Sequence, residues 1–432
     1  MRQFLLLLLF VLLAPTIVSA QDEQLLGSAD GATAFVDTVD ADKDDVDTIS
    51  VDSAFVDKSA NDTLPWPYNV RTALDVLLTN SMFETSQVGL MVYDLTADST
   101  IYSKNERQLM RPASTMKLVT AIAAIDRLGG SYQLRTSLYY NGKIENRTLT
   151  GDVYCMGGFD PRFNSDDMNA FVESLRGMGV DTIRGRIIAD KSMKDASLLG
   201  EGWCWDDDNP VLSPLLISRK DNFVERFVDE LREAGVVVEA FNSEGEVPQE
   251  AHCVCTRSHT IDQILMRMMK DSDNLYAEAM FYQVASAVGG RPAHASHARS
   301  AIKSVIGKAG GNASMCKVAD GSGLSLYNYV SAELETKLLR YAYRNSNIYL
   351  HLYPSLPIAG EDGTLSRRMR GTHAAGNVRA KTGTLTGVYS LAGYCTAANG
   401  HVLCFSILNQ GVLHASNGRA FQDRVCSVLC RP

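Results

Sequence analysis

Runs of apolar residues give the first part of the chain a clear order of elements. Residues 87–96 and 99–103 alternate between apolar and polar side chains on either side of a short polar turn, which predicts two adjacent strands. Residues 115–128 are apolar on almost every side and stop at a Gly-Gly pair, which predicts a buried helix rather than a surface one. The folded part therefore begins with a strand pair that leads into a buried central helix.

The pattern changes twice after that helix. From about residue 133 to 257 it consists of short strands and turns with one or two helices, and from residue 260 helical periodicity returns before strands and a last helix end the chain. The segments are strands at 134–140, 151–156, 183–188, 378–381, 387–396 and 401–408 and helices at 221–234, 261–269, 275–287 and 419–429. This order predicts an α+β fold, residues 63–132 together with 258–432, interrupted by an inserted, mostly β domain at residues 133–257.

The N-terminus has the pattern of an export signal. The basic residue Arg2 precedes an unbroken apolar run at residues 4–13, and small residues at 18–20 provide a cleavage site before Gln21. Because a membrane span needs about 20 apolar residues, the run is too short to be one. We therefore expect a signal peptide at residues 1–20, export to the periplasm and no transmembrane span after cleavage. The alternative is an uncleaved anchor.

The acidity of the chain is local. The formal net charge is −9, and residues 21–62 alone hold twelve acidic residues and two lysines. A segment with so much charge and so few apolar residues cannot bury enough surface to fold, so we expect a disordered acidic tether at 21–62. A chain with this balance is not expected to have nucleic acid as a partner.

Nine cysteines are scattered through the 432 residues. No close pair has the spacing of a zinc site with a second pair or histidines nearby, so no metal is expected. After export the cysteines would meet an oxidising compartment, where an odd number leaves at least one unpaired unless it bridges two chains. Their spacing does not predict the pairing.

Candidate chemistry begins where the buried helix starts. Ser114 and Lys117 stand three residues apart, so one turn of helix places both on the same face. A serine is a weak nucleophile until a neighbouring base takes its proton, and a lysine can be that base when burial and nearby positive charge lower its pKa. Ser300 and Lys303 have the same spacing, so what favours Ser114 is its position at the start of an apolar helix, directly after a strand pair.

A second motif, Ser272-Asp273-Asn274, lies between two expected helices. The hydroxyl of Ser272 can relay a proton between the base and a leaving amine, and the amide of Asn274 can hold both the base and the substrate backbone. Residues 59–61 also fit the pattern Ser-x-Asn, but they belong to the expected tether. The second motif is therefore assigned to residues 272–274.

A third motif, Lys381-Thr382-Gly383-Thr384, stands at the end of an expected strand and occurs once. The Lys381 amine can pair with a substrate carboxylate, and the hydroxyls of Thr382 and Thr384 can add contacts. Gly383 lets an extended substrate come close to the backbone. The backbone N–H groups of Thr384 and Ser114 could together form an oxyanion hole.

In this order, the three motifs are the signature of penicillin-binding proteins and class A β-lactamases. From about residue 87 to its C-terminus, the chain resembles the low-molecular-mass class C penicillin-binding proteins, the D-alanyl-D-alanine carboxypeptidase/endopeptidase group. Residues 151–161, 320–325 and 356–365 add to this resemblance. It implies a penicillin-binding or serine β-lactamase-like transpeptidase fold, in which helices cover both faces of an antiparallel sheet.

The resemblance also implies a mechanism. Ser114 attacks the carbonyl of the penultimate D-Ala of a peptidoglycan stem peptide, with Lys117 as the general base. Ser272 passes the proton to the leaving group, and Asn274 positions the reacting groups. An acyl-enzyme forms and water cleaves it, which requires neither a metal nor an organic cofactor. β-Lactams would acylate Ser114 as covalent inhibitors.

The resemblance implies substrate contacts as well. Lys381 and Thr382 would hold the terminal carboxylate, and the Thr384 backbone would help to stabilise the oxyanion. Asp160 resembles a family position near the side-chain amine of the stem peptide, where a carboxylate would pair with that amine. Because Asp160 precedes a proline, the alternative is an ordinary turn residue.

The spacing of the motifs bears on the alternatives. Ser114 and Ser272 are 158 positions apart, whereas a class A β-lactamase keeps that gap much shorter. The gap is still shorter than is usual in the family, so a nested third domain is expected to be largely missing between residues 205 and 234. A serine β-lactamase and an inactive wall-binding homologue remain alternative functions. Carboxypeptidase and endopeptidase activity cannot be ranked, because they share one acyl-enzyme mechanism.

Overall fold

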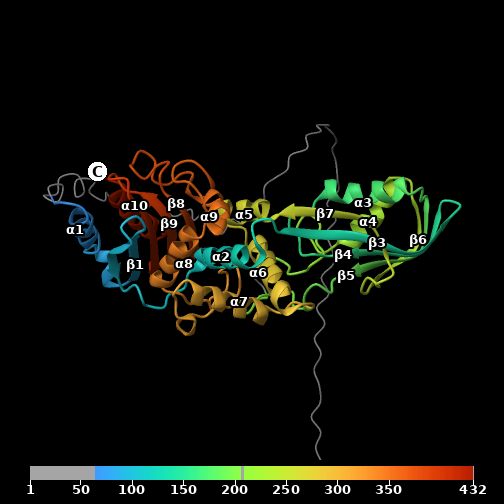
Figure 1. Cartoon of the computed structure of the whole chain (residues 1–432), viewed down its shortest axis with the longest axis horizontal. Coiled ribbons are helices and arrows are strands. Elements are labelled where there is room, and N and C mark those ends of the chain that lie inside the picture. Colours follow the sequence, from blue (N-terminus) through green and yellow to red (C-terminus); the bar gives the residue numbers. More distant parts are fainter. Residues whose placement is uncertain (1–63, 206–208, 432) are drawn as a thin grey trace, which may run out of the picture. The chain divides into compact units, whose positions relative to one another are not determined.

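The computed structural model describes residues 64–205 and 209–431 of the chain (Figure 1). The expected signal peptide and acidic tether lie outside the described residues. Within the described part, no helix is both long enough and apolar enough to cross a membrane. Two five-stranded sheets and the helices around them account for the fold.

The first sheet joins segments from both ends of the described chain. Its order is β2-β1-β10-β9-β8, and all neighbouring strands are antiparallel. A strand pair near the N-terminus therefore completes a sheet whose other three strands lie near the C-terminus (Figure 1). The strands are β1 (Gln87–Asp94), β2 (Ser99–Lys104), β8 (Arg379–Leu385), β9 (Val388–Thr396) and β10 (Val402–Gln410).

Helices cover both faces of this sheet, as predicted. Leu90 and Phe405 belong to one apolar cluster, whereas Tyr93 and Cys404 of the same strands belong to another. This division follows because successive side chains of a strand point to opposite faces. The helices are α1 (Tyr68–Leu77) and α10 (Ala415–Cys430) on one face, and α2 (Met116–Leu128), α5 (Ile261–Lys270), α6 (Asn274–Gly289), α7 (Ala295–Lys308), α8 (Ala332–Arg344) and α9 (Ser346–Ser355) on the other.

The predicted central helix is confirmed as α2. Ten of its 13 residues, from Met116 to Ile125, are buried, and the helix ends at Gly129, whose φ of 83° suits glycine. A short 3-10 turn, η4 (Ala113–Thr115), leads into it from the strand pair. Because α2 is enclosed on nearly all sides, a polar side chain on its first turn lies inside the protein.

The second sheet is formed by residues 133–260. Its order is β6-β5-β4-β3-β7, with antiparallel pairs around β3 and parallel pairs around β5. Two helices pack on it through a cluster rich in phenylalanine. Its elements are β3 (Gln133–Glu145), β4 (Thr148–Met156), α3 (Ser165–Gly177), β5 (Thr182–Asp190), α4 (Phe223–Glu233), β6 (Val237–Glu244) and β7 (His252–Thr260). The domain boundaries at residues 133 and 257 stay a prediction.

Three expected strands end or begin short of the observed ones at a hairpin turn. β3 and β4 continue to a tight turn at Asn146 and Arg147, which have φ values of 49° and 62°. A two-residue turn with both φ values positive matches the twist of the paired strands, so pairing extends to the turn. Similarly, β8 continues to Leu385, because its hairpin turn to β9 comes only at residues 386–387. The third motif therefore lies inside a strand and not at its end.

Candidate active site

A strained turn holds Ser114 at the start of α2. The residue before it, Ala113, has a φ of 48°, which is unfavourable for a residue with a side chain. The carbonyl oxygen of Pro112 accepts hydrogen bonds from the hydroxyls of Thr115 at 2.8 Å and Ser390 at 2.5 Å. Since Ser390 belongs to β9, these bonds fasten the turn to the first sheet.

Lys117 lies one turn further along and is fully buried. Its Nζ is 2.9 Å from Ser114 Oγ, 2.6 Å from Asn274 Oδ1 and 2.9 Å from the Ser322 carbonyl oxygen. All three neighbours are oxygens that can accept a hydrogen bond. An amine in this position can take a proton from the Ser114 hydroxyl and hold it as an ammonium group.

The second motif forms the connection between α5 and α6. Ser272 has a φ of 61°, and Asp273 caps α6 by accepting hydrogen bonds from two N–H groups of its first turn. The Asp273 carboxylate also accepts from Arg267 Nε at 2.9 Å and from Arg219. These bonds fix the strained connection, so that Asn274 reaches Lys117 and Ser272 faces the third motif.

The third motif meets the second through Lys381. Its Nζ donates to Ser272 Oγ at 2.9 Å and to its neighbour's carbonyl oxygen at 2.8 Å. The amine is fully buried, and burial together with the positive charge of Lys117 holds the pKa of Lys381 well below its usual value. The Thr382 hydroxyl donates to Thr364 Oγ1 at 2.8 Å. Thr384 is exposed.

Gly383 brings the strand up against the Ser114 turn. A Cβ at this position would lie 2.1 Å from Ser390 Oγ and 2.9 Å from the Ser114 backbone nitrogen, so no side chain fits there. The approach of β8 places Thr382 and Thr384 on either side of this contact. The three motifs, far apart in sequence, are thus brought together in one place.

A glycine-rich segment that sequence reasoning left without a role completes the site. Lys117 donates to the Ser322 carbonyl, and the segment around it is held by two buried carboxylates. Glu278 Oε1 accepts from the N–H groups of Gly321 at 3.0 Å and Ser322 at 2.7 Å, and Asp320 accepts from the N–H of Gly323 at 2.8 Å. Burial, and then the nearby Asp320, raises the pKa of Glu278 to about 8.

The same segment packs on the nucleophile turn. A Cβ on Gly323, which has a φ of +84°, would lie 1.8 Å from the Ala113 carbonyl oxygen. Two signals could have pointed to these residues. Glu278 stands one helical turn after Asn274, on the same face of α6, and residues 320–325 carry two glycines and two serines around a single aspartate.

The predicted site residue Asp160 has its hydrogen-bond partners outside the three motifs. Its side chain is fully buried and accepts from the Arg162 N–H at 3.0 Å, with the second oxygen 2.7 Å from His259 Nδ1. Among the described residues, no hydrogen bond or ion pair joins it to the three motifs. The alternative Ser-x-x-Lys pair, Ser300 and Lys303, is exposed on α7.

Among the described residues there is neither a cluster of metal-ligating side chains nor a disulfide. Within residues 64–205 and 209–431, no group of three or more His, Cys, Asp or Glu side chains could hold a metal ion. All nine cysteines are free thiols, and five of them are buried. The disulfide pairing therefore stays open.

Comparison with known proteins identifies the family. A family model described as the D-Ala-D-Ala carboxypeptidase 3 (S13) family matches residues 70–215 and 215–431. The chain belongs to this family. The two matched parts of the S13 family model meet at Leu215, inside the stretch between residues 205 and 234 where a nested third domain is expected to be missing.

Relatives with known names match most of the chain. It is 27% identical over 413 residues to the D-alanyl-D-alanine carboxypeptidase DacB of Haemophilus influenzae, covering 76% of this chain and 86% of that one. It is also 27% identical over 440 residues to a D-alanyl-D-alanine carboxypeptidase of an Actinomadura species, covering 79% and 81%. The crystal structure of penicillin-binding protein 4 from H. influenzae is 26% identical, with a TM-score of 0.73 and coverage of 82% and 97%. That protein has also been solved in complex with a β-lactam. The fold of the chain is therefore that of the S13 penicillin-binding carboxypeptidases.

Proposed function

We propose that this S13 peptidase hydrolyses the D-Ala-D-Ala bond of peptidoglycan stem peptides through an acyl-enzyme on Ser114. The observation that carries the proposal is the 2.9 Å contact between Ser114 Oγ and the buried Nζ of Lys117. A serine without an adjacent base is a poor nucleophile, and Lys117 supplies that base inside the protein. We therefore assign the nucleophile to Ser114 and the general base to Lys117.

In the first step, the Ser114 hydroxyl gives its proton to Lys117 while its oxygen bonds to the carbonyl carbon of the penultimate D-Ala. The resulting ammonium keeps hydrogen-bond acceptors in Asn274 at 2.6 Å and Ser322 at 2.9 Å. Because these oxygens already face the nitrogen, the new charge forms in a preorganised environment. The developing oxyanion would accept hydrogen bonds from the N–H groups of Ser114 and Thr384.

In the second step, the C–N bond breaks and the departing D-Ala needs a proton. Ser272 would give its hydroxyl proton to the leaving amine and recover one from the Lys117 ammonium. Its oxygen also accepts a hydrogen bond from Lys381 at 2.9 Å, which orients the hydroxyl. Water then attacks the ester on Ser114, with Lys117 again as the base, and releases the shortened peptide.

Lys381 and Thr382 are proposed to select substrates with a free terminal carboxylate. Because the Lys381 amine is fully buried, it would act on that carboxylate through the Ser272 hydroxyl, to which it donates a hydrogen bond, rather than by direct contact. The close packing of Gly383 on the Ser114 turn keeps β8, along which the peptide would lie, beside the nucleophile. A substrate whose terminus is amidated should therefore bind poorly.

Asp160 has a separate, secondary place in the proposal. A carboxylate that binds the side-chain amine of the stem peptide must be accessible, whereas Asp160 is buried against His259 at 2.7 Å. A role in substrate binding thus requires that this contact opens. If it does, Asp160→Asn should raise KM for a peptide with a free side-chain amine and leave an N-acetylated peptide unaffected.

We also propose that the protein acts in the periplasm. A signal peptide at residues 1–20 would export the protein to the periplasm, where its substrate and the β-lactams are found. The proposal predicts that the protein recovered from the periplasmic fraction begins at Gln21. Recovery with an intact N-terminus in the membrane fraction would contradict it.

The decisive test is digestion of purified muropeptides by the wild type and Ser114→Ala. The wild type should release free D-Ala, split cross-links or both, and loss of the nucleophile should lower the rate by about 10⁴-fold or more. Ser300→Ala is the matched control, because it removes a serine of the same local pattern and should change nothing.

A fluorescent penicillin separates the alternatives in the same preparation. A long-lived adduct on Ser114 supports the penicillin-binding carboxypeptidase. Rapid release of hydrolysed penicillin would favour a β-lactamase instead. Absence of any adduct together with absence of peptide products would favour an inactive wall-binding protein.

A further inference from the structure

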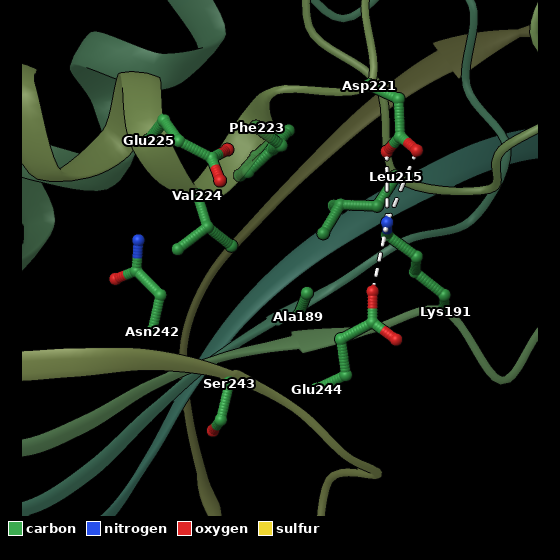
Figure 2. Close-up of a pocket in the computed structure, with 10 residues that line it drawn as sticks. All are labelled: Ala189, Lys191, Leu215, Asp221, Phe223, Val224, Glu225, Asn242, Ser243 and Glu244. Carbon is green, nitrogen blue, oxygen red and sulfur yellow. Dashed lines mark hydrogen bonds and ion pairs between the residues drawn. The ribbon is translucent and has the colours of Figure 1, made fainter. Parts of the chain in front are cut away.

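Two cavities outside the motif cluster differ in their charge. The first, of about 230 Å³, lies between α4 and strands β5 and β6 (Figure 2). Its lysine, Lys191, is already paired with Asp221 at 3.1 Å and Glu244 at 3.2 Å. With Glu225 also lining it, this cavity holds more carboxylates than cations, and its positive charge is already neutralised.

The second cavity, of about 420 Å³, has the opposite character. It lies where the C-terminal end of α2, the start of β3 and helix α6 meet. Two arginines, Arg135 and Arg291, line it, and no Asp or Glu does. Neither arginine forms an ion pair with a carboxylate of the described residues, although Arg291 contacts the sulfur of Met156 at 3.8 Å. Its volume lies within the range of small-molecule sites.

The uncharged polar side chains that line this cavity are held in place by hydrogen bonds. The Tyr132 hydroxyl donates to Gln283 Oε1 at 2.8 Å, and Gln283 Nε2 donates to the Gly158 carbonyl at 2.6 Å. Gly158 in turn lies against β3, since a Cβ there would be 1.7 Å from the Arg135 carbonyl oxygen. The backbone that carries Arg135 is thereby held in place.

The side chains left to meet a ligand are mainly donors. They are the two guanidinium groups, the hydroxyls of Ser131 and Ser286 and the amide of Gln133. Burial raises the pKa of Tyr132, and the charges of Arg291 and Arg135, which line the same cavity, oppose that rise. Two planar cations with nearby hydroxyls match the oxygens of a carboxylate or a phosphate.

We propose that Arg135 and Arg291 form a subsite for a carboxylate or phosphate group, distinct from the Ser114 centre. Leu128 at the cavity lies at the far end of the helix that begins beside Ser114, roughly 16 Å along its axis from Lys117. The two sources of such a group are a free carboxylate of the cell-wall peptide and free phosphate. The first of these rests on the proposed function, and the second does not.

Calorimetric titration of the full-length protein with inorganic phosphate and with succinate tests the subsite itself. Ionic strength is held constant with sodium chloride. Saturable binding of at least one anion is expected, with an affinity at least tenfold lower in the Arg135→Gln/Arg291→Gln double variant. Lys191→Gln in the other cavity and Ser114→Ala at the nucleophile should bind as the wild type does. Unchanged binding in the double variant, or no saturable binding to the wild type, would overturn the proposal.

Kinetics with two substrates distinguishes the sources. If the ligand is a wall peptide, the double variant should show a KM at least fivefold higher for muropeptides, with kcat and the rate of acylation by penicillin unchanged. If only phosphate binds, KM should not change while the calorimetric difference remains. Because Ser114→Ala abolishes turnover but leaves anion binding intact, failure of the proposed function and failure of the subsite give different results.

Discussion

At the scale of single residues, the site is built from ionisable groups that have been removed from water. Lys117 and Lys381 are both fully buried, and each reaches neutral oxygens of the motifs. Glu278 is buried behind them and binds the backbone that presents the Ser322 carbonyl to Lys117. Charges in such surroundings are costly unless they are bonded, so these residues should respond strongly to pH and to substitution.

The raised pKa of Glu278 predicts the pH dependence of stability. The ordinary pKa is 4.5 and the folded value is about 8, so between these values the folded protein keeps a proton that the unfolded chain has released. Stability should therefore fall as pH rises from about 5 to 8 and should level off above that range. Glu278→Gln mimics the protonated form, and its melting temperature should fall less over the same range.

The control for this experiment is Glu173→Gln, which removes an exposed carboxylate. Its melting temperature should follow that of the wild type at each pH. Equal slopes for the wild type and Glu278→Gln would show that Glu278 does not carry the effect.

At the scale of elements, the sequence predicted the strands and helices that have strong periodicity. The pair 87–96 and 99–103, the central helix and the three chemical motifs were all placed on the correct element types, because alternation and apolar runs are local properties. It did not predict the ends of β3 and β8, which depend on where each hairpin turns. It also left the Ser322 carbonyl without a role, since the composition of residues 320–325 does not show which of their carbonyl groups faces Lys117.

A substitution at Gly323 tests whether the packing of residues 320–325 on the Ser114 turn matters for acylation. In Gly323→Ala, the new Cβ would meet the Ala113 carbonyl oxygen and push residues 320–325 away from the Ser114 turn. The acylation rate with a fluorescent penicillin should fall by about 100-fold, because small displacements of reacting groups have large effects. Gly310→Ala is the matched control, since Gly310 also has a positive φ but has no atom within 4 Å of the new Cβ. A similar loss in both variants would assign the effect to backbone strain.

At the scale of the whole molecule, the second motif depends on a segment that the fold inserts between the first two motifs. Arg219 follows the point at which the two matched parts of the family model meet, and it binds Asp273 together with Arg267. Asp273, the central residue of the motif, thus binds residues outside the site, whereas Ser272 and Asn274 contact the two buried lysines. Sequence alone could not predict this ion pair. Arg219 lies in an irregular loop, 54 positions before Asp273 at the start of α6.

Arg219→Gln tests this connection. Since Arg219 is partly exposed and Asp273 keeps Arg267, the loss of stability should be modest, roughly 1–2 kcal/mol. The acylation rate should fall more than stability predicts, because the strained connection at Ser272 loses one of its supports. Arg226→Gln, which breaks an exposed pair with Glu230, is the control. An acylation rate equal to that of the control would limit Arg219 to a structural role.

Because β1 pairs with β10, the first sheet cannot form until nearly all of the chain has been synthesised. Ser114 and Lys117 are synthesised long before β8, β9 and β10. The sheet beside them cannot form until those last strands have left the ribosome. On the proposed mechanism, the unfinished chain should therefore be unable to hydrolyse its substrate until those strands have paired.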